Sequence, residues 1–503
     1  MRGHRTLAVL GACLLPGVIF AQGPPRGFWT VPGYDPSHTS WQKAETEITP
    51  DTVSKDFKFL WKLKLGNAAK ASLSEPLLYP GLITGRGFKD LALLADGGTV
   101  YAVDSELGEV VWKKDFPSAS GSKACGNIQI VPEAPQVIHF GAHRQTGSRP
   151  AAPPPSETPL PRDQRRVGAA PGGGYFGLRG VFVLTSDGYI HEQVMSTGRD
   201  YAPPVKWIAA PGGSSFGLNM SDKVVYTFSG SGCKNVPAEV WSIDLNTADY
   251  TVGNYKDQKF SLAGLSGPAL GTDGTAYIST ASGTLALDAG LKVKDSYSPS
   301  TAGKMLNAGP VVLTYKGKEL IVAGGGGGSL VALDSQSLGG TDHHTPMAQT
   351  APITKAALRG AWESLAGGQD KSGGLWVFAS ISGPVNPGIK FPNSNGPAPH
   401  GSLVAFKLEE QDGKMVLTPA WISRDLSNPA PPAIANGVVF ALEGGRAHAT
   451  LYALDAATGK QLYTSGDSIT ANSRLAGVSV GDGHVFFTTR DNTLYSFGIP
   501  MEH

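Results

Sequence analysis

Residues 451–463, with the sequence LYALDAATGKQLY, have the pattern of a strand, a tight turn and a returning strand. Leu451 and Ala453 alternate with their neighbours in the period of two that is typical of a half-buried strand. Asp455 can hydrogen-bond the backbone ahead of it, and Gly459 supplies the positive φ that closes the turn. One such hairpin cannot bury its own apolar faces, so it requires neighbouring strands.

Weaker copies of this hairpin recur along the chain, each inside a longer unit with the pattern of four strands. The units span residues 71–116, 124–208, 214–256, 265–297, 307–350, 356–423, 430–467 and 473–500. The last unit stops before its fourth strand. The segment 57–65 has the pattern of that missing strand, with Trp61 at the place that Trp112 and Trp421 take in their units.

A closed ring is the economical arrangement for such an array, because closure removes the open ends that a linear solenoid would have to cap. The sequence therefore predicts an all-β fold, an eight-bladed β-propeller of four-stranded antiparallel blades, with the last blade completed by an N-terminal strand. Small residues occupy one register of the hairpin copies, and we expect an aromatic side chain of the next sheet to pack over each of them. These residues are Ala102, Ala286, Ala332, Ala405 and Ala453.

The N-terminus has the pattern of a secretory signal. Residues 1–21 combine a basic start with an apolar stretch from Leu7 to Phe20, too short for a good membrane span. A lipoprotein anchored at Cys13 is the alternative, although the apolar stretch before Cys13 is very short. The predicted protein is exported, to the periplasm or outside the cell.

After the signal, we expect an extended arm over residues 22–56 and a single propeller domain over 57–500. The Pro- and Gly-rich insertion 149–174 is predicted to be a flexible surface loop. The net charge of +1 gives no electrostatic support to a nucleic-acid partner. Loss of the signal leaves two cysteines, Cys125 and Cys233, and an even pair in an exported protein predicts a disulfide; two separate buried thiols are the alternative.

The hairpin pattern apolar-Tyr-Ala-Leu-Asp-x-x-Thr-Gly-Lys resembles the repeat of the pyrroloquinoline quinone (PQQ) propeller superfamily. The arm is also similar to the first segment of that superfamily, at residues 34–36, 48–50 and 60–61. The superfamily includes quinoprotein alcohol dehydrogenases and non-enzymatic members such as an outer-membrane assembly lipoprotein. The resemblance covers most of residues 57–500 and implies the architecture more specifically than any activity.

The residues that the dehydrogenases use are only partly matched. Their adjacent cysteines, placed against one face of PQQ, correspond here to Ala-Cys-Gly-Asn at 124–127, so one cysteine is missing. Their calcium-binding Glu corresponds to Tyr175, a neutral aromatic that cannot supply a charged oxygen to Ca²⁺. A string with the catalytic Asp is not found. Trp362 is the one candidate for the tryptophan that lies under the cofactor, and between-blade packing is its alternative role.

The loops between blades and the loops between second and third strands emerge on the same face of a propeller. Polar side chains from the inter-blade segments are therefore expected around the channel mouth, where they suit a polar ligand, or else satisfy backbone groups and water. The candidate cofactor- or ligand-binding residues are Asn127, Asn307, Arg359, Trp362 and Arg474, and Asn219, Asn428 and Asn472 occupy comparable positions. The longest loop on this face is 382–400 in the sixth unit.

The string Asp342-His343-His344 is the one short cluster of metal-ligand types, but no third partner at a defined spacing accompanies it, so no metal site is predicted. Two hypotheses of function remain. The first is a non-catalytic exported propeller that binds a protein or a polar small molecule on its loop face. The second is a quinoprotein-like dehydrogenase that oxidises an alcohol or sugar with PQQ and Ca²⁺ at a divergent site, and passes electrons to a separate acceptor.

Overall fold

The computed structural model describes most of the chain between residues 27 and 500. Not described are 1–26, 67–72, 85–86, 117–127, 134–179, 209–214, 230–237, 248, 257–261, 264–266, 301–304, 307, 355–363, 446, 474–476 and 501–503. The signal segment, Cys13 and the insertion 149–174 thus lie outside the described residues. In the part that is described, no helix is long and apolar enough to cross a membrane.

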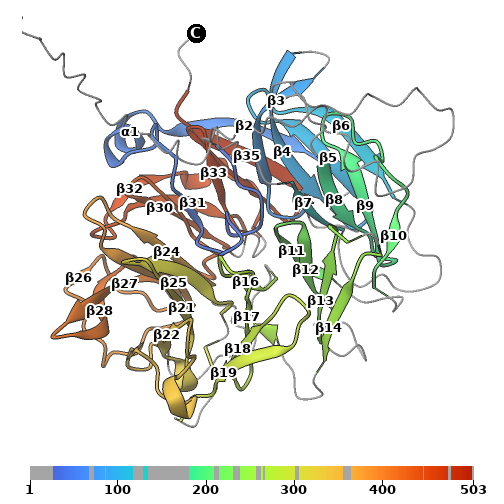
Figure 1. Cartoon of the computed structure of the whole chain (residues 1–503). Helices are drawn as coiled ribbons and strands as arrows, with labels where there is room; N and C mark the ends of the chain where they lie inside the picture. Colours follow the sequence, from blue (N-terminus) through green and yellow to red (C-terminus); the bar gives the residue numbers. More distant parts are fainter. Residues whose placement is uncertain are drawn as a thin grey trace, which may run out of the picture.

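Eight antiparallel sheets surround a common centre, and each forms one blade with its first strand innermost (Figure 1). Blades 1 to 4 contain β3 (Leu77–Thr84), β4 (Gly87–Ala95), β5 (Thr99–Asp104) and β6 (Glu109–Asp115); β7 (Gln129–Pro132), β8 (Gly180–Leu184), β9 (Tyr189–Val194) and β10 (Val205–Lys206); β11 (Ser215–Ser221), β12 (Val224–Ser229), β13 (Glu239–Asp244) and β14 (Val252–Lys256); and β15 (Leu262–Ala263), β16 (Ala269–Leu270), β17 (Ala276–Thr280), β18 (Gly283–Leu287) and β19 (Val293–Tyr297).

Blades 5 to 8 complete the ring. They contain β20 (Val311–Tyr315), β21 (Lys318–Gly324), β22 (Leu330–Asp334) and β23 (Ala348–Gln349); β24 (Ser364–Gln369), β25 (Leu375–Ser382), β26 (Asn393–Ser394), β27 (Gly401–Gln411) and β28 (Lys414–Ile422); β29 (Ala433–Ala435), β30 (Val438–Glu443), β31 (Thr450–Asp455) and β32 (Gln461–Thr464); and β33 (Ser479–Gly481), β34 (His484–Thr488), β35 (Thr493–Gly498) and β2 (Lys58–Lys64). Three short 3₁₀ turns lie in loops: η1 (Gly326–Gly328), η2 (Gly340–Asp342) and η3 (Gly466–Ser468).

The N-terminal strand closes the ring, as predicted. β2 pairs antiparallel with β35 from Lys58 opposite Gly498 to Lys64 opposite Thr493, so it is the outermost strand of blade 8. The innermost strands of neighbouring blades contact one another all the way round, including β33 of blade 8 with β3 of blade 1. The predicted eight-bladed propeller is therefore confirmed, and the described strands of each blade fall inside the predicted units, apart from β15.

The turn chemistry of the hairpins explains why they fold locally. The Asp455 carboxylate accepts hydrogen bonds from the backbone N–H of Ala457 and Thr458 at 3.1 and 2.9 Å, and Gly459 has a φ of 70°. Asp104 accepts from Glu106 and Leu107 in the same way, both at 3.1 Å. An aspartate that holds its own turn reduces the entropy cost of starting the return strand.

Tryptophans join consecutive blades. Trp112 in β6 packs on Gly198 in the outer turn of blade 2, and Trp421 in β28 packs on Gly459 in the outer turn of blade 7. Each indole also donates Nε1–H to a carbonyl of that next blade, Trp112 to Met195 at 2.8 Å and Trp421 to Ala456 at 2.9 Å.

This packing corrects one detail of the sequence analysis. Ala102 and Ala405 lie directly opposite Trp112 and Trp421 in the same sheet, so each small residue makes room for the tryptophan of its own blade. The small residue that receives the tryptophan of the neighbouring blade is the turn glycine.

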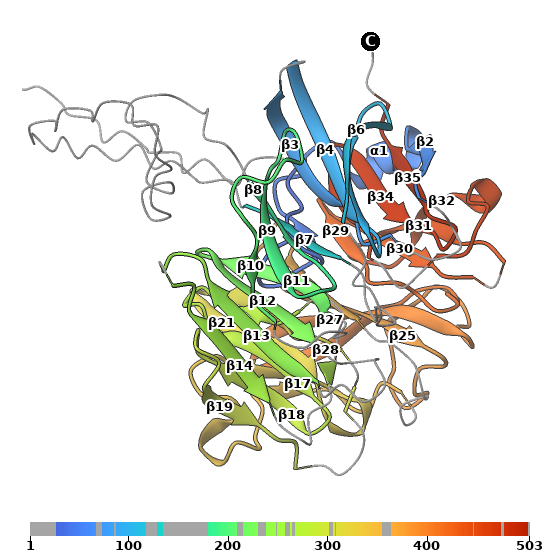
Figure 2. The ribbon, with the colours of Figure 1, turned by 90° about the vertical axis from the view of Figure 1, so that its right-hand side faces the viewer.

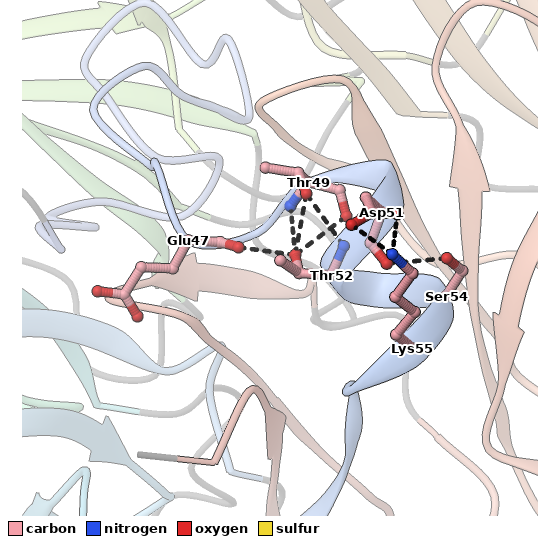
Figure 3. Close-up of polar contacts among 6 residues, drawn as sticks. All are labelled: Glu47, Thr49, Asp51, Thr52, Ser54 and Lys55. Carbon is pink, nitrogen blue, oxygen red and sulfur yellow. Dashed lines mark hydrogen bonds and ion pairs between the residues drawn. The ribbon is translucent and has the colours of Figure 1, made fainter. Parts of the chain in front are cut away.

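The arm contains one helix, α1 (Pro50–Lys55), where the sequence analysis expected only an extended segment. Thr49 caps it: the Thr49 hydroxyl accepts from Thr52 N at 3.1 Å, and the Thr52 hydroxyl accepts from Thr49 N at 2.9 Å (Figure 3). Pro50 stands at the first turn, where its missing N–H costs nothing. Such a reciprocal cap with a following proline is a helix-start signal that the sequence contained.

Candidate functional site

The arm preceding α1 runs through the centre of the ring, where the dark-blue trace crosses between the blades (Figure 1). Its backbone carbonyls accept hydrogen bonds from the innermost strands of several blades. The carbonyls of Pro36, Ser37, Thr39 and Ser40 accept from the N–H groups of Leu270, Val312, Gly367 and Ile434 in blades 4, 5, 6 and 7, at 2.7, 3.0, 2.9 and 2.7 Å. At the two ends of this path, Trp29 bridges Leu78 of blade 1, and β1 (Trp41–Gln42) pairs parallel with β29 of blade 7.

Glu75, on the segment that leads into blade 1, is the carboxylate that the arm engages. It accepts hydrogen bonds from Trp29 Nε1 at 2.8 Å, from Gly33 N at 3.1 Å and from Gly477 N at 3.1 Å. Burial raises the pKa of Glu75 to about 7, and the three N–H donors only partly offset this rise. Glu75 thus ties the arm to blades 8 and 1.

Other polar side chains on this path are also used within the chain. Asn219, at full burial, donates to the carbonyls of Pro36 and Pro268 at 2.7 and 2.8 Å, and its own carbonyl oxygen accepts from Met220 N at 2.8 Å. Gln42 donates to the carbonyl of Val480 at 3.2 Å. For Asn219 the alternative weighed from sequence, satisfaction of backbone groups inside the channel, is the observed role.

Five of the residues predicted to surround the channel mouth are not placed by the structure. Asn127, Asn307, Arg359, Trp362 and Arg474 all lie outside the described residues, and so does Tyr175. The cysteines Cys125 and Cys233 lie outside them too, so their disulfide stays a prediction.

Three carboxylates meet on the opposite rim, where the turns of blades 8 and 1 adjoin. The side-chain oxygens of Asp90, Glu106 and Asp482 lie within 4.8 Å of one another. Burial, followed by repulsion from the neighbouring carboxylates, raises the pKa of Glu106 to about 7. His484 Nδ1 lies 3.6 Å from Glu106 Oε1, and burial lowers the pKa of this histidine.

The long loop of blade 6 builds a pocket on the outside of the ring, which we call the blade 6–7 pocket. After β25 the loop runs outward, adds β26 to the edge of β28, and returns to β27. Asn395 fastens it to blade 7 by donating from Nδ2 to the carbonyls of Ile422 and Thr458 at 3.0 and 3.1 Å. The pocket has a volume of about 350 Å³ and is lined by Asn395, Gly396, Pro397, Arg424, Asp425, Leu454, Gly459 and Gln461.

Two charged side chains of opposite sign face this pocket. The Arg424 guanidinium lies over the Tyr452 ring, 4.8 Å from its centroid, and donates to Gln461 Oε1 at 2.8 Å. Asp425 accepts from the His400 backbone N–H at 2.8 Å and lies 2.7 Å from His400 Nδ1. Burial alone would raise the pKa of Asp425, but the contacts with His400 hold it below the ordinary value. Both charges are therefore fixed in place at neutral pH.

The His343 and His344 rings are engaged with their own surroundings. His343 Nδ1 lies 2.9 Å from Asp295 Oδ1 and 3.1 Å from the Ser296 carbonyl, and His344 Nδ1 lies 2.7 Å from the Ser298 carbonyl. Asp342 accepts from the backbone of His344 and Thr345 at 2.9 and 3.0 Å. These contacts give the string a role in holding the β22–β23 loop of blade 5 against the outer strand of blade 4.

The fold is that of the PQQ-type eight-bladed propellers, as the hairpin repeat predicted. Among solved structures, the chain is similar to the quinohemoprotein alcohol dehydrogenase of Comamonas testosteroni, with a TM-score of 0.58 at 12% identity over 95% of this chain and 81% of that one. It is similar to quinohemoprotein alcohol dehydrogenase ADHIIG of Pseudomonas putida HK5, with a TM-score of 0.56 at 12% identity over 95% and 82%.

A europium-containing methanol dehydrogenase matches with a TM-score of 0.52 at 13% identity, over 94% of this chain and 98% of that one. No family model matches the sequence, and no curated protein matches it. At identities this low the likeness concerns the architecture alone.

The residues that the resemblance puts beside the cofactor and its metal, Cys125 and Tyr175, lie outside the described residues, so the expected misfit to PQQ with Ca²⁺ stays a prediction. Among the described residues of the channel, Glu75 has both carboxylate oxygens engaged by N–H groups of the chain itself.

Proposed function

We propose that this protein is an exported, non-catalytic propeller that binds a protein or a polar small molecule on its loop face. The blade 6–7 pocket, on the outside of the ring, is its first binding site, and the channel mouth around Asn127, Asn307, Arg359 and Arg474 on the loop face is the second. Residues 1–21 serve as the export signal, and Cys125 with Cys233 forms a disulfide between neighbouring blades.

One contrast carries this proposal: the polar groups of the channel are bonded within the chain, whereas those of the blade 6–7 pocket keep donors for a ligand. In the described part of the channel, Glu75 and Asn219 bond to the arm, and Gln42 of the arm bonds to blade 8. In the blade 6–7 pocket, Arg424 makes one side-chain hydrogen bond within the described chain and keeps its other N–H groups for a ligand. A propeller whose described channel groups are paired within the chain, and whose outer pocket keeps N–H donors for a ligand, is suited to binding.

Two measurements on the purified mature protein test the proposal. Incubation with PQQ and Ca²⁺, followed by a dye-linked oxidation assay with alcohols and sugars, is expected to give no stoichiometric PQQ binding and no turnover. A thermal-shift screen of polar small molecules is expected to give hits that Arg424→Ala removes. Stoichiometric PQQ binding with turnover would overturn the proposal.

A quinoprotein-like dehydrogenase is the second candidate, and the likeness of fold over 95% of the chain favours it. Bound PQQ would supply the two-electron acceptor for an alcohol or sugar, with a separate protein taking the electrons onward. Trp362 and Arg359 are the residues of this chain that would then contact the cofactor. Loss of turnover in Trp362→Ala, with the thermal stability unchanged, would support this candidate over the first.

A further inference from the structure

The blade 6–7 pocket has properties that define the chemistry of its ligand. Its walls come from three segments far apart in sequence: the blade 6 loop, the connection after β28, and the outer hairpin of blade 7. Its volume of about 350 Å³ lies at the lower end of the range for small-molecule sites, roughly 300–1,000 Å³. A ligand of one or two rings fills it.

The charges of the pocket disfavour a simple ion. Arg424 attracts an anion, but Asp425 stands beside it in the chain and in the same wall, and repels the same anion. A cation is attracted by Asp425 and repelled by Arg424. A neutral ligand with several hydroxyl groups avoids both conflicts, because a hydroxyl accepts from a guanidinium with its lone pairs and donates to a carboxylate with its proton.

The remaining lining groups suit such a ligand. Asn395 uses both Nδ2 protons to hold the loop, and within the described chain its Oδ1 is left as an acceptor. Gln461 accepts from Arg424 through Oε1, which leaves its amide N–H groups as donors. Leu454 and Pro397 add apolar surface between these polar groups. Alternating donors and acceptors beside a small apolar surface match the hydroxyls and the C–H face of a sugar ring.

The polar groups are held before any ligand arrives. Tyr452 stacks under Arg424 and donates its hydroxyl to Glu443 at 3.3 Å, and His400 holds Asp425. Groups that are already fixed lose little entropy on binding, so even a shallow site gains affinity.

From these observations we propose that the blade 6–7 pocket binds a sugar residue, either free or at the end of an oligosaccharide. This inference rests on the proposed binding function and adds the class of its ligand. The contacts assign Arg424 and Asp425 to adjacent hydroxyl groups, and Asn395 and Gln461 to the rim.

The test uses the mature protein, an array of immobilised oligosaccharides, and calorimetric titration with methyl glycosides of common hexoses. Binding of one group of sugars is expected. Arg424→Ala and Asp425→Asn should each weaken it by at least about tenfold, the loss of one charged hydrogen bond. Asp273→Asn, which alters an aspartate of blade 4 whose pKa is also held below the ordinary value, should leave it unchanged.

Asp425 also supports the loop through His400, so its replacement can disturb the pocket itself. Gln461→Ala, which leaves that anchor in place, is therefore included and should weaken sugar binding as well. If no sugar binds to folded protein, or if binding is the same in all three pocket variants, the sugar inference is wrong. Binding of amino acids or carboxylates that depends on Arg424 would overturn the sugar class and keep the binding function, whereas PQQ-dependent turnover without any ligand at Arg424 would overturn both.

Discussion

At the scale of the residue, the turn glycines carry two constraints at once. Gly459 needs a positive φ for the hairpin, and it also receives the Trp421 ring, which is fully buried and hydrogen-bonded to blade 7. The first constraint is visible in the sequence as the Asp-x-x-x-Gly turn. The second depends on a side chain from another blade. For this reason the sequence analysis expected the aromatic ring of the next blade to pack on an alanine and not on the turn glycine.

Replacement of Gly459 by alanine should therefore lower the free energy of unfolding by more than the strain of an alanine at positive φ. The Cβ would overlap the Trp421 ring, and overpacking of this kind costs about 1–3 kcal/mol in addition to about 1–2 kcal/mol for an alanine in the left-handed region. Gly274→Ala is the matched control, because Gly274 has a φ of 78° and nothing lies within 4 Å of its Cβ position. Chemical denaturation measures the free energy of unfolding of both variants. Equal losses would show that the Trp421 ring can move away from the new Cβ without cost.

Glu75 gives the fold a dependence on pH. Its pKa rises from 4.5 to about 7 in the folded chain, so the bound proton stabilises the fold; this contribution is complete below 4.5 and is lost as the pH rises through about 7. Glu75→Gln removes the titration. The variant should be about 1 kcal/mol less stable at acid pH, where it loses an acceptor for Gly477 N, and the difference should shrink or reverse at alkaline pH.

The difference in stability between Glu75→Gln and the wild type, followed over pH, separates the contribution of Glu75 from that of other titrating groups. Glu106 also has its pKa raised to about 7, so it too lowers the stability of the fold as the pH rises. The lowered pKa of His484 has the opposite effect and makes the fold more stable as the pH rises. Melting temperatures of both proteins between acid and alkaline pH provide the measurement. Parallel curves would mean that Glu75 does not titrate in this range.

At the scale of the element, three outer strands present a tryptophan to the next blade in unequal ways. The indole N–H groups of Trp112 and Trp421 each donate to a carbonyl. Trp61 Nε1 in β2 is buried and has no hydrogen-bond partner among the residues that the structure describes. Replacement by phenylalanine keeps an aromatic ring and removes the N–H. We expect Trp112→Phe and Trp421→Phe to cost about 1–2 kcal/mol more than Trp61→Phe.

Equilibrium unfolding of the three variants checks this order, because the loss of ring volume is common to all. A Trp61→Phe protein that is the least stable of the three would contradict it. The result also bears on the blade that the N-terminal strand completes, since Trp61 lies on Gly108 at the junction of blades 8 and 1.

How far the elements could be predicted follows from where their determinants lie. Blades 1, 5 and 7 repeat the same local turn chemistry, so Asp104, Asp334 and Asp455 indicate their hairpins within a few residues. The blade 6–7 pocket has no such signature, because Asn395, Arg424 and Gln461 come from separate segments that only the folded ring brings together. The sequence analysis identified the long loop 382–400 and could not identify what it covers.

At the scale of the whole molecule, the arm connects several blades at the centre of the ring, and we call its residues 29–42 the hub. Between residues 36 and 40 it bonds to four blades in turn, so its sequence shows no period. It bends through positive φ at three residues that are not glycine, Tyr34, His38 and Ser40. These conformations are sustained by contacts with the blades, which the sequence of the arm does not reveal. The sequence analysis expected an extended arm over residues 22–56 and did not place any of it at the centre of the ring, where residues 36–40 bond to blades 4 to 7.

A chain that begins at Glu45 tests this role, because it keeps α1 and β2 and removes the hub. The backbone N–H groups of Leu270, Val312, Gly367 and Ile434 then lose their acceptors, at about 1 kcal/mol each. Blades on opposite sides of the ring also lose the one segment that touches both, so we expect a lower midpoint of unfolding and separate transitions by tryptophan fluorescence and far-ultraviolet circular dichroism. Asn219→Ala, which removes a side-chain contact with Pro36 and leaves these backbone bonds in place, should lower the midpoint and keep one transition. A truncated chain that unfolds in one step at the original midpoint would show that closure by β2 alone holds the ring together.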